Sequence, residues 1–268
     1  MYKILCTCLS LLVLGTGFSW AITYSDLVIA DNPISYWKLS ETTGTTAVDQ
    51  QNRNSATYVG SPTLGASGAI SDGTKAITLG PGTDQYAIKS EFTSFPTTAI
   101  TVEFWMRSSD TTNAGTPFSY AISTNCNEFL IYNYNSLAVY VNGAAVDSGI
   151  ALTDGLWHQI AVTWRSSDGA VAIFKDGKSV YTNTLQTGSS IGGGGTLVLG
   201  QEQDSVGGSF EPTQRFIGSL DDVSVYNYVL SSTRISEHYQ IALPEPSTWL
   251  LLSLAICAGL WTKLRRIL

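Results

Sequence analysis

The stretch that decides the fold class runs Ala99-Ile-Thr-Val-Glu-Phe-Trp-Met-Arg107. Two sets of side chains alternate along it, namely Ile100, Val102, Phe104, Met106 and Thr101, Glu103, Trp105, Arg107. Alternation with a period of two is the pattern of a β-strand, because a helix would mix the two sets on one face. The stretch therefore predicts a strand with an apolar face turned to a core.

Shorter segments of the same kind lie on both sides of this strand. Turn residues separate them, and Asn142-Gly143 and Asp176-Gly177 are dipeptides that type I′ hairpins favour. The predicted strands are 56–59, 76–79, 85–88, 130–134, 137–141, 157–164, 171–174, 179–184 and 216–226. We predict an all-β fold, an antiparallel jelly-roll β-sandwich. One short C-terminal helix is expected over 231–240, begun by a Ser cap and packing Ile235 against the sandwich.

Composition and charge bound the function classes. The chain has 268 residues, 14 basic and 21 acidic side chains, and a net charge of −7. This balance provides no basic surface for nucleic acid, so we expect no nucleic-acid partner. Only 13% of the residues are charged, which suits an exported all-β protein. We predict one domain over residues 22–243, large enough to bury most of its apolar surface without disulfides.

Residues 1–21 have the pattern of a secretory signal peptide. Lys3 precedes an apolar run over 4–14, and Ser19-Trp-Ala21 is a small-residue ending. We expect cleavage after Ala21. An uncleaved N-terminal anchor is the alternative, but the run is too short to cross a bilayer of about 30 Å as a helix.

Residues 244–268 form a second apolar targeting segment. They begin Pro244-Glu-Pro, run apolar from Trp249 to Trp261 and end with the basic residues Lys263, Arg265 and Arg266. This order resembles the PEP-CTERM sorting signal of Gram-negative bacteria. The resemblance implies export through the inner membrane, transient membrane anchoring, removal of the tail by an exosortase, and a final place at the cell surface or in the extracellular matrix. Permanent anchoring is the alternative, and thirteen apolar residues make a marginal span.

Cys126 is the only cysteine of the predicted domain, since Cys6, Cys8 and Cys257 lie in the terminal segments. A single thiol in an exported domain cannot form an internal bridge. It is either buried and inert or available for an intermolecular disulfide.

Residues 201–214 read QEQDSVGGSFEPTQ and hold the candidate binding residues. The apolar runs on both sides predict an exposed loop between two strands. Gly207 and Gly208 allow the chain to reverse, so that carboxylate and amide oxygens from both ends can face one point. Calcium binds about six to eight such oxygens in irregular arrangements. The loop therefore predicts a calcium site, with a solvated acidic turn as the alternative.

The segment from Gly200 to Gln214, followed by a strand ending at Tyr226, resembles the calcium loop of the pentraxins. These belong to the wider laminin-G and concanavalin A-like lectin fold. The resemblance implies five ligands in the loop and one in a second segment near residue 127. They are the side chains of Glu202, Asp204, Glu211 and Gln214, the backbone carbonyl of Gln203, and Asn127.

The chain departs from the family pattern in three places. Cys126 stands where the family has the Asp of an Asp-Asn pair, and a soft thiol does not suit calcium. Asn125 and Glu128 are candidate replacements for that Asp. The cysteines of the family disulfide are matched by Glu103 and Ala161. In the phosphocholine pocket of the family, Tyr132 keeps an aromatic ring and Ala145 replaces an acidic residue.

Catalysis is not predicted. His158 lies in a strand pattern and His238 near the end of the helix, and neither has a nucleophile in a known motif. A glycoside hydrolase is the enzyme alternative, because Glu202-Gln-Asp204 imitates half of the carboxylate pattern of jelly-roll hydrolases. Val206 does not continue that pattern.

Two functions of different classes remain. One is a calcium-dependent recognition domain at the cell surface that binds a glycan or another extracellular polymer. The other is a structural protein of the extracellular matrix, in which calcium would only stiffen the domain. The resemblance also makes assembly into oligomers an expectation.

Overall fold

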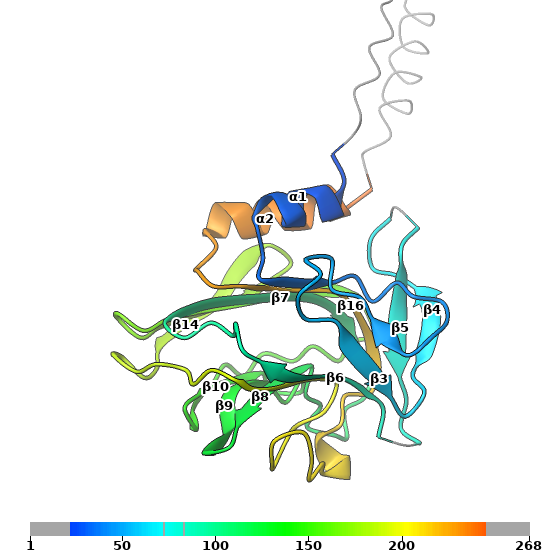
Figure 1. Cartoon of the computed structure of the whole chain (residues 1–268). Coiled ribbons are helices and arrows are strands. Elements are labelled where there is room, and N and C mark those ends of the chain that lie inside the picture. The colour runs from blue at the N-terminus through cyan, green and yellow to red at the C-terminus, as the bar shows by residue number, and fades with distance from the viewer. Residues whose placement is uncertain (1–21, 72, 83, 245–268) are drawn as a thin grey trace, which may run out of the picture.

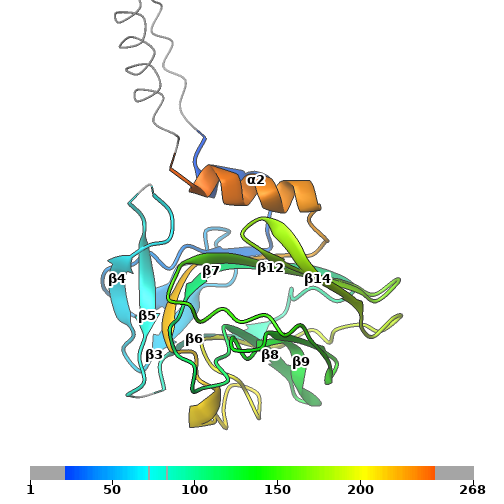
Figure 2. The same cartoon turned by 180° about the vertical axis from the view of Figure 1, so that it is seen from behind.

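The computed structural model describes residues 22–71, 73–82 and 84–244. The predicted signal peptide and all but the first residue of the predicted C-terminal tail lie outside these ranges. Two antiparallel sheets pack face to face, and two helices lie across the outer side of one of them (Figures 1 and 2). The predicted sandwich is confirmed.

Each sheet has eight strands, and we name the sheets after β7 and β9. The β7 sheet has the order β14 (Lys178–Thr184), β13 (Ala170–Lys175), β12 (His158–Arg165), β7 (Ala99–Arg107), β16 (Gly218–Tyr226), β5 (Lys75–Leu79) and β4 (Thr63–Ser67), with β1 (Ser35–Trp37) paired to β16. The β9 sheet has the order β11 (Ala144–Asp147), β10 (Ala138–Val141), β9 (Asn125–Tyr132), β8 (Phe118–Ile122), β15 (Gly195–Leu199), β6 (Tyr86–Phe92), β3 (Ala56–Val59) and β2 (Thr46–Ala47). All pairings between named strands are antiparallel.

The main core lies between the two sheets. Its largest side chains include Trp37, Phe92, Phe104, Phe118 and Trp164, each less than 2% exposed. Burying one such side chain contributes about 1.5–3 kcal/mol, so this layer supplies the main stabilisation of the fold.

The outer face of β7 is buried as well. Thr101, Glu103 and Trp105 are at most 3% exposed, although the alternating pattern places them opposite the core. The helices α1 (Tyr24–Ala30) and α2 (Ser232–Ala242) cover this face (Figure 1). Both faces of β7 are therefore shielded from water.

The helix α1 corrects the prediction of a single C-terminal helix. Thr23 and Asp26 form a capping box, in which Asp26 N donates to Thr23 Oγ1 (3.1 Å) and Thr23 N donates to Asp26 Oδ2 (3.0 Å). Seven residues are too few for a stable isolated helix. Tyr24 and Val28, both buried against the β7 sheet, provide the packing that stabilises it.

The helix α2 is joined to the sheet by buried polar contacts. Ser231 caps it and Ile235 is fully buried, as predicted. His238 Nδ1 lies 2.8 Å from Glu103 Oε2, and His238 Nε2 lies 2.9 Å from Asp31 Oδ2. Within residues 22–71, 73–82 and 84–244, every helix falls short of the length and hydrophobicity that a membrane span requires.

The structure also locates the two positions that match the family disulfide. Glu103 on β7 and Ala161 on β12 are direct partners in the register of the two strands. The Glu103 carboxylate accepts a hydrogen bond from Gln159 Nε2 and also meets His238. At the position that matches the family disulfide, hydrogen bonds of Glu103 with Gln159 and with His238 of α2 therefore stand in place of a covalent bond between β7 and β12.

Candidate metal site

The loop of residues 201–214 connects β15 to β16 and lies on the side of the β9 sheet that faces away from the helices (Figure 1, yellow). Its first three residues, 201–203, are buried, which corrects the prediction of a wholly exposed loop. Burial follows because this part of the chain lies against the interior strands β8 and β15, where Gln203 bonds to Ser119 and Thr196.

A tight turn over residues 205–208 reverses the loop. Ser205 N donates to Gly208 O at 3.2 Å and Gly208 N donates to Ser205 O at 2.9 Å. Gly207 has a φ of +69°, a conformation that a residue with a Cβ rarely adopts. The short helix η1 (Pro212–Gln214) then brings Gln214 back toward the start of the loop.

One small pocket, of about 110 Å³, gathers four of the six predicted metal residues. Its lining is Asn127, Leu130, Tyr132, Tyr140, Glu202, Asp204 and Gln214. These residues come from β9, β10, the start of the loop at 202–204 and η1. The predicted meeting of the segment near residue 127 with the loop is therefore seen in the structure.

Three oxygen atoms of this lining have no hydrogen-bond partner among the described residues. They are Asn127 Oδ1, Glu202 Oε2 and Gln214 Oε1, and each is buried. A buried polar atom without a partner costs about 1–3 kcal/mol. Three unpaired oxygens around one small pocket are the donor set that a hard divalent cation prefers, so the residues present fit calcium.

The charge at the pocket supports the same fit. Burial raises the pKa of the Glu202 carboxyl to about 7, and the nearby charges of Asp204 and Glu211 act in the same direction. A hydrogen bond from the backbone of Gln203 partly offsets them. A carboxyl group under these conditions is destabilised in its ionised form unless a cation lies close to it.

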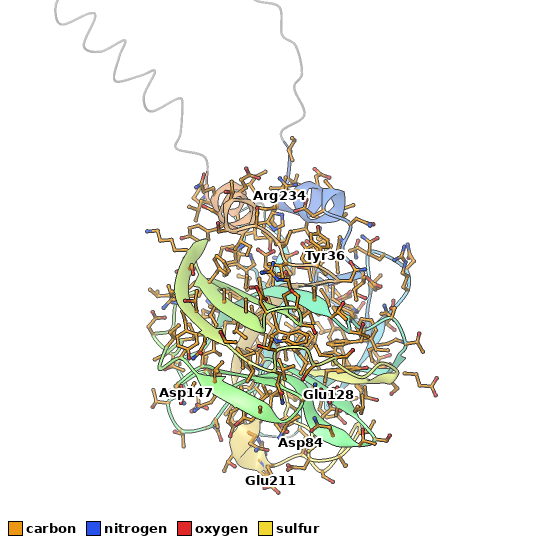
Figure 3. The ribbon with its side chains drawn as sticks, turned by 90° about the vertical axis from the view of Figure 1, so that its left-hand side faces the viewer. Tyr36, Asp84, Glu128, Asp147, Glu211 and Arg234 are labelled. Carbon is orange, nitrogen blue, oxygen red and sulfur yellow. The ribbon has the colours of Figure 1, made fainter. Side chains whose placement is uncertain are left out.

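Glu211 and Gln203 are placed differently from the other four. The Glu211 side chain is exposed and does not line the pocket, although it is close enough to act on the pKa of Glu202. Figure 3 shows Glu211 at the end of the molecule opposite Arg234 of α2. The Gln203 side chain is fully buried against the outer face of the β9 sheet, so only its backbone is left for the role that the resemblance gives it.

Carboxylates alone do not make the site. Among the described residues, no three His, Cys, Asp or Glu side chains lie together as a metal-binding group. The pocket instead combines two carboxylates with two amide side chains. Calcium takes Asn and Gln carbonyls as ligands alongside carboxylates, and these amides lower the negative charge that the empty pocket must tolerate.

The neighbours of Asn127 do not replace the missing Asp. Glu128 lines neither this pocket nor its neighbour, and its two oxygens accept hydrogen bonds from Gly192 N and, at 2.9 Å, from Asn125 Nδ2. Asn125 and Cys126 line a neighbouring pocket, which shares Asp204 with the candidate site. Cys126 is a half-buried free thiol there.

Sequence reasoning missed one side chain of the pocket lining, Tyr140. Its ring stands nearly perpendicular to that of Tyr132, with 6.0 Å between centroids, and both rings line the pocket. The signal was present, because Val139 and Val141 face the core and the alternation of β10 turns Tyr140 outward.

Neither histidine lies at this pocket. His158 is held between two carboxylates, with Nδ1 at 2.8 Å from Asp176 Oδ2 and Nε2 at 2.9 Å from Asp154 Oδ2. His238 lies under α2. In the described residues, both histidines thus make ion pairs that join structural elements.

The sequence profile described as the Pentaxin family matches residues 81–253, well over half of the chain. The chain belongs to this family. The predicted resemblance to the pentraxins is therefore confirmed, and the match includes strand β6, the 201–214 loop and α2.

Two curated relatives and one solved structure illustrate the similarity of this pentraxin domain. It is 46% identical over 140 residues to the sushi, von Willebrand factor type A, EGF and pentraxin domain-containing protein 1 of Rattus norvegicus. The aligned residues cover 51% of this chain and 4% of that protein. It is 39% identical over 140 residues to neuronal pentraxin-2 of Homo sapiens, covering 51% and 32%. The chain thus spans only a small part of these relatives.

The solved structure is the heptameric SAP-like pentraxin from Limulus polyphemus. It superposes with a TM-score of 0.51 at 27% identity, covering 59% of this chain and 78% of that one. These three relatives are animal proteins and give no support to export from a Gram-negative bacterium, which stays a prediction of the terminal segments.

Proposed function

We propose that this pentraxin-family chain is an exported recognition domain that binds calcium and, through it, an extracellular ligand. The observation that carries the proposal is the set of three buried, unpaired oxygens on Asn127, Glu202 and Gln214 around one pocket. Membership of a family of binding proteins favours this function over the glycoside hydrolase alternative.

Four side chains would hold the ion, and they come from separate parts of the fold. Asn127, Glu202, Asp204 and Gln214 line the pocket, and the Gln203 carbonyl and Glu211 complete the set that the resemblance implies. Bound calcium supplies a positive centre with open coordination positions for oxygens of a ligand. Asn127 and Gln214 orient their amide oxygens toward that point without adding charge.

The ligand class follows from the same lining. Tyr132 and Tyr140 present ring surfaces beside the carboxylates, and Leu130 adds an apolar contact. Aromatic rings beside a cation suit a ligand that combines hydroxyl or anionic oxygens with an apolar carbon surface. We propose a glycan or a similar extracellular polymer.

The terminal segments supply the cellular part of the proposal. Residues 1–21 would direct export, and residues 244–268 would anchor the chain until an exosortase removes the tail. The heptameric assembly of the Limulus pentraxin supports oligomerisation as a further expectation.

Isothermal titration with calcium tests the metal site. We expect binding by the unchanged chain and at least tenfold weaker binding by Asp204→Asn, because one anionic ligand is lost. Asp168→Asn is the matched control, since Asp168 is an exposed residue paired with Arg165. Absence of heat with the unchanged chain would exclude both the recognition and the calcium-stiffened structural roles.

A glycan array in calcium and in chelator then separates the two remaining functions. Recognition predicts glycans retained with calcium and released by the chelator. A purely structural domain would retain nothing in either condition.

A further inference from the structure

The side chain of Gln203 is the most fully hydrogen-bonded group of the loop. Gln203 is completely buried, and its Nε2 lies 3.0 Å from Ser119 O, 3.1 Å from Ser119 Oγ and 3.1 Å from Thr196 O. Its Oε1 accepts from Gly207 N at 2.8 Å. One amide therefore joins two neighbouring strands, β8 and β15, to the far side of the turn.

This anchoring determines where the neighbouring residues face. Glu202 and Asp204 both line the pocket, while Gln203 between them points at the outer face of strands β8 and β15. Successive side chains of an extended chain point to opposite sides, so fixing Gln203 toward the sheet directs the two carboxylates away from these strands together. Asn127, on the strand next to β8, meets them there.

The second contact closes the turn. Gly207 N donates to Gln203 Oε1. Among the described residues, the other hydrogen bonds of the turn at 205–208 are the pair between Ser205 and Gly208 and the one that Ser205 Oγ donates to Ser209 Oγ. Beyond it, Phe210 packs on Tyr86 with 4.7 Å between ring centroids. The chain segment that leads from the turn back to Gln214 thus begins at Gly207, whose backbone N is bonded to Gln203.

We propose that Gln203 is a positioning residue whose buried amide sets the calcium loop in its binding conformation before the ion arrives. The inference rests on the proposed calcium function. Binding groups that are already oriented do not lose conformational freedom when a ligand binds, and outer hydrogen bonds of this kind strengthen metal sites by about 10- to 100-fold.

The test uses Gln203→Met in the full chain, which keeps the volume and removes the polar atoms. We expect calcium affinity to fall at least tenfold by isothermal titration. Gln201→Met is the matched control, because Gln201 is an equally buried glutamine whose amide makes two long contacts with described residues, of 3.3 and 3.4 Å. Its affinity should stay within about threefold.

A second readout needs no calcium. Hydrogen exchange of the amides of 204–210 in the calcium-free chain should be about tenfold faster in Gln203→Met and unchanged in Gln201→Met. A merely structural role would lower the melting temperature and leave the calcium affinity of the folded protein unchanged. Terbium luminescence sensitised by Tyr132 and Tyr140 should also weaken in Gln203→Met.

Ser119→Ala is the milder variant if Gln203→Met does not fold. It removes one of the three acceptors of Gln203 Nε2, and we expect a two- to fivefold loss of affinity. Equal affinity of the folded variants and the unchanged chain overturns this inference alone. If the unchanged chain binds no calcium, the proposed function fails and takes the inference with it.

Discussion

Glu202 shows how a single residue can be unfavourable for the fold and useful for binding. It is 2% exposed, and one of its carboxylate oxygens has no partner among the described residues. A buried unpaired charge destabilises the protein, and a bound cation relieves the cost. Glu202 therefore lowers the stability of the ion-free protein and raises that of the ion-bound protein.

Glu202→Gln should separate these two effects. In the calcium-free chain at pH 8 we expect the neutral amide to raise stability by about 1–2 kcal/mol, or roughly 2–8 °C in melting temperature. In saturating calcium the same variant should melt below the unchanged chain. Differential scanning calorimetry with and without chelator measures both, and a change of the same sign in both conditions would contradict the assignment.

Cys126 should be dispensable for calcium binding. Its side chain lines the neighbouring pocket and not the one that contains Asn127 and Glu202. We expect Cys126→Ser to bind calcium within twofold of the unchanged chain by isothermal titration. A tenfold loss would instead make the thiol part of the site.

At the scale of single elements, α2 is held on the β7 sheet by a titratable contact. Burial acts to lower the pKa of His238, but the hydrogen bond and charge of Glu103 and the charge of Asp31 outweigh it, so the pKa lies above its usual value. A raised histidine pKa adds stability below the unfolded value of about 6.5, and this stability is lost as the pH rises through the folded value.

We therefore expect α2 to be more firmly docked at pH 6 than at pH 8.5. Hydrogen exchange of residues 232–242 at the two pH values, corrected for the intrinsic rates, should show the difference. His238→Gln should remove it. His158→Gln is the control, because His158 also has a raised pKa, through its hydrogen bond to Asp176, but lies at β12. The prediction fails if His238→Gln leaves the pH dependence intact.

Strand patterns were predictable where packing alone determines the sequence. The segments 56–59 and 99–107 match β3 and β7, because their alternation reflects the core. The strand β9 begins at Asn125, although apolar alternation predicted a start at 130. Asn127 lines the pocket, and Glu128 accepts hydrogen bonds from Asn125 and Gly192, so polar contacts obscure the apolar strand pattern there.

The site was predictable in composition and only partly in geometry. Oxygen-bearing residues and the family pattern identified Asn127, Glu202, Asp204 and Gln214, all of which line the pocket. The burial of Gln203 and the inward turn of Glu128 could not be predicted, because both depend on partners far along the chain, at Ser119 and Gly192. α1 was missed because a seven-residue helix depends on tertiary packing more than on its own sequence.

At the scale of the whole molecule, calcium should stabilise the folded state. A ligand that binds only the folded protein adds about 2.7 kcal/mol at a concentration one hundredfold above its dissociation constant. We expect the melting temperature to rise with calcium and to return with chelator. Magnesium should have a much smaller effect, because it requires a stricter octahedral arrangement than this mixed lining offers. Equal shifts with both ions would contradict a calcium site.

The helices and the 201–214 loop lie on opposite sides of the sandwich. The helices, with α2 near the C-terminal end of the described residues, lie on one side, and the 201–214 loop, which contains Glu211, lies on the other (Figures 1 and 3). A copy attached to a surface through its C-terminal end would therefore expose the pocket and its loop to the surrounding medium. Neighbouring copies on the same surface would all present their candidate binding sites to the medium.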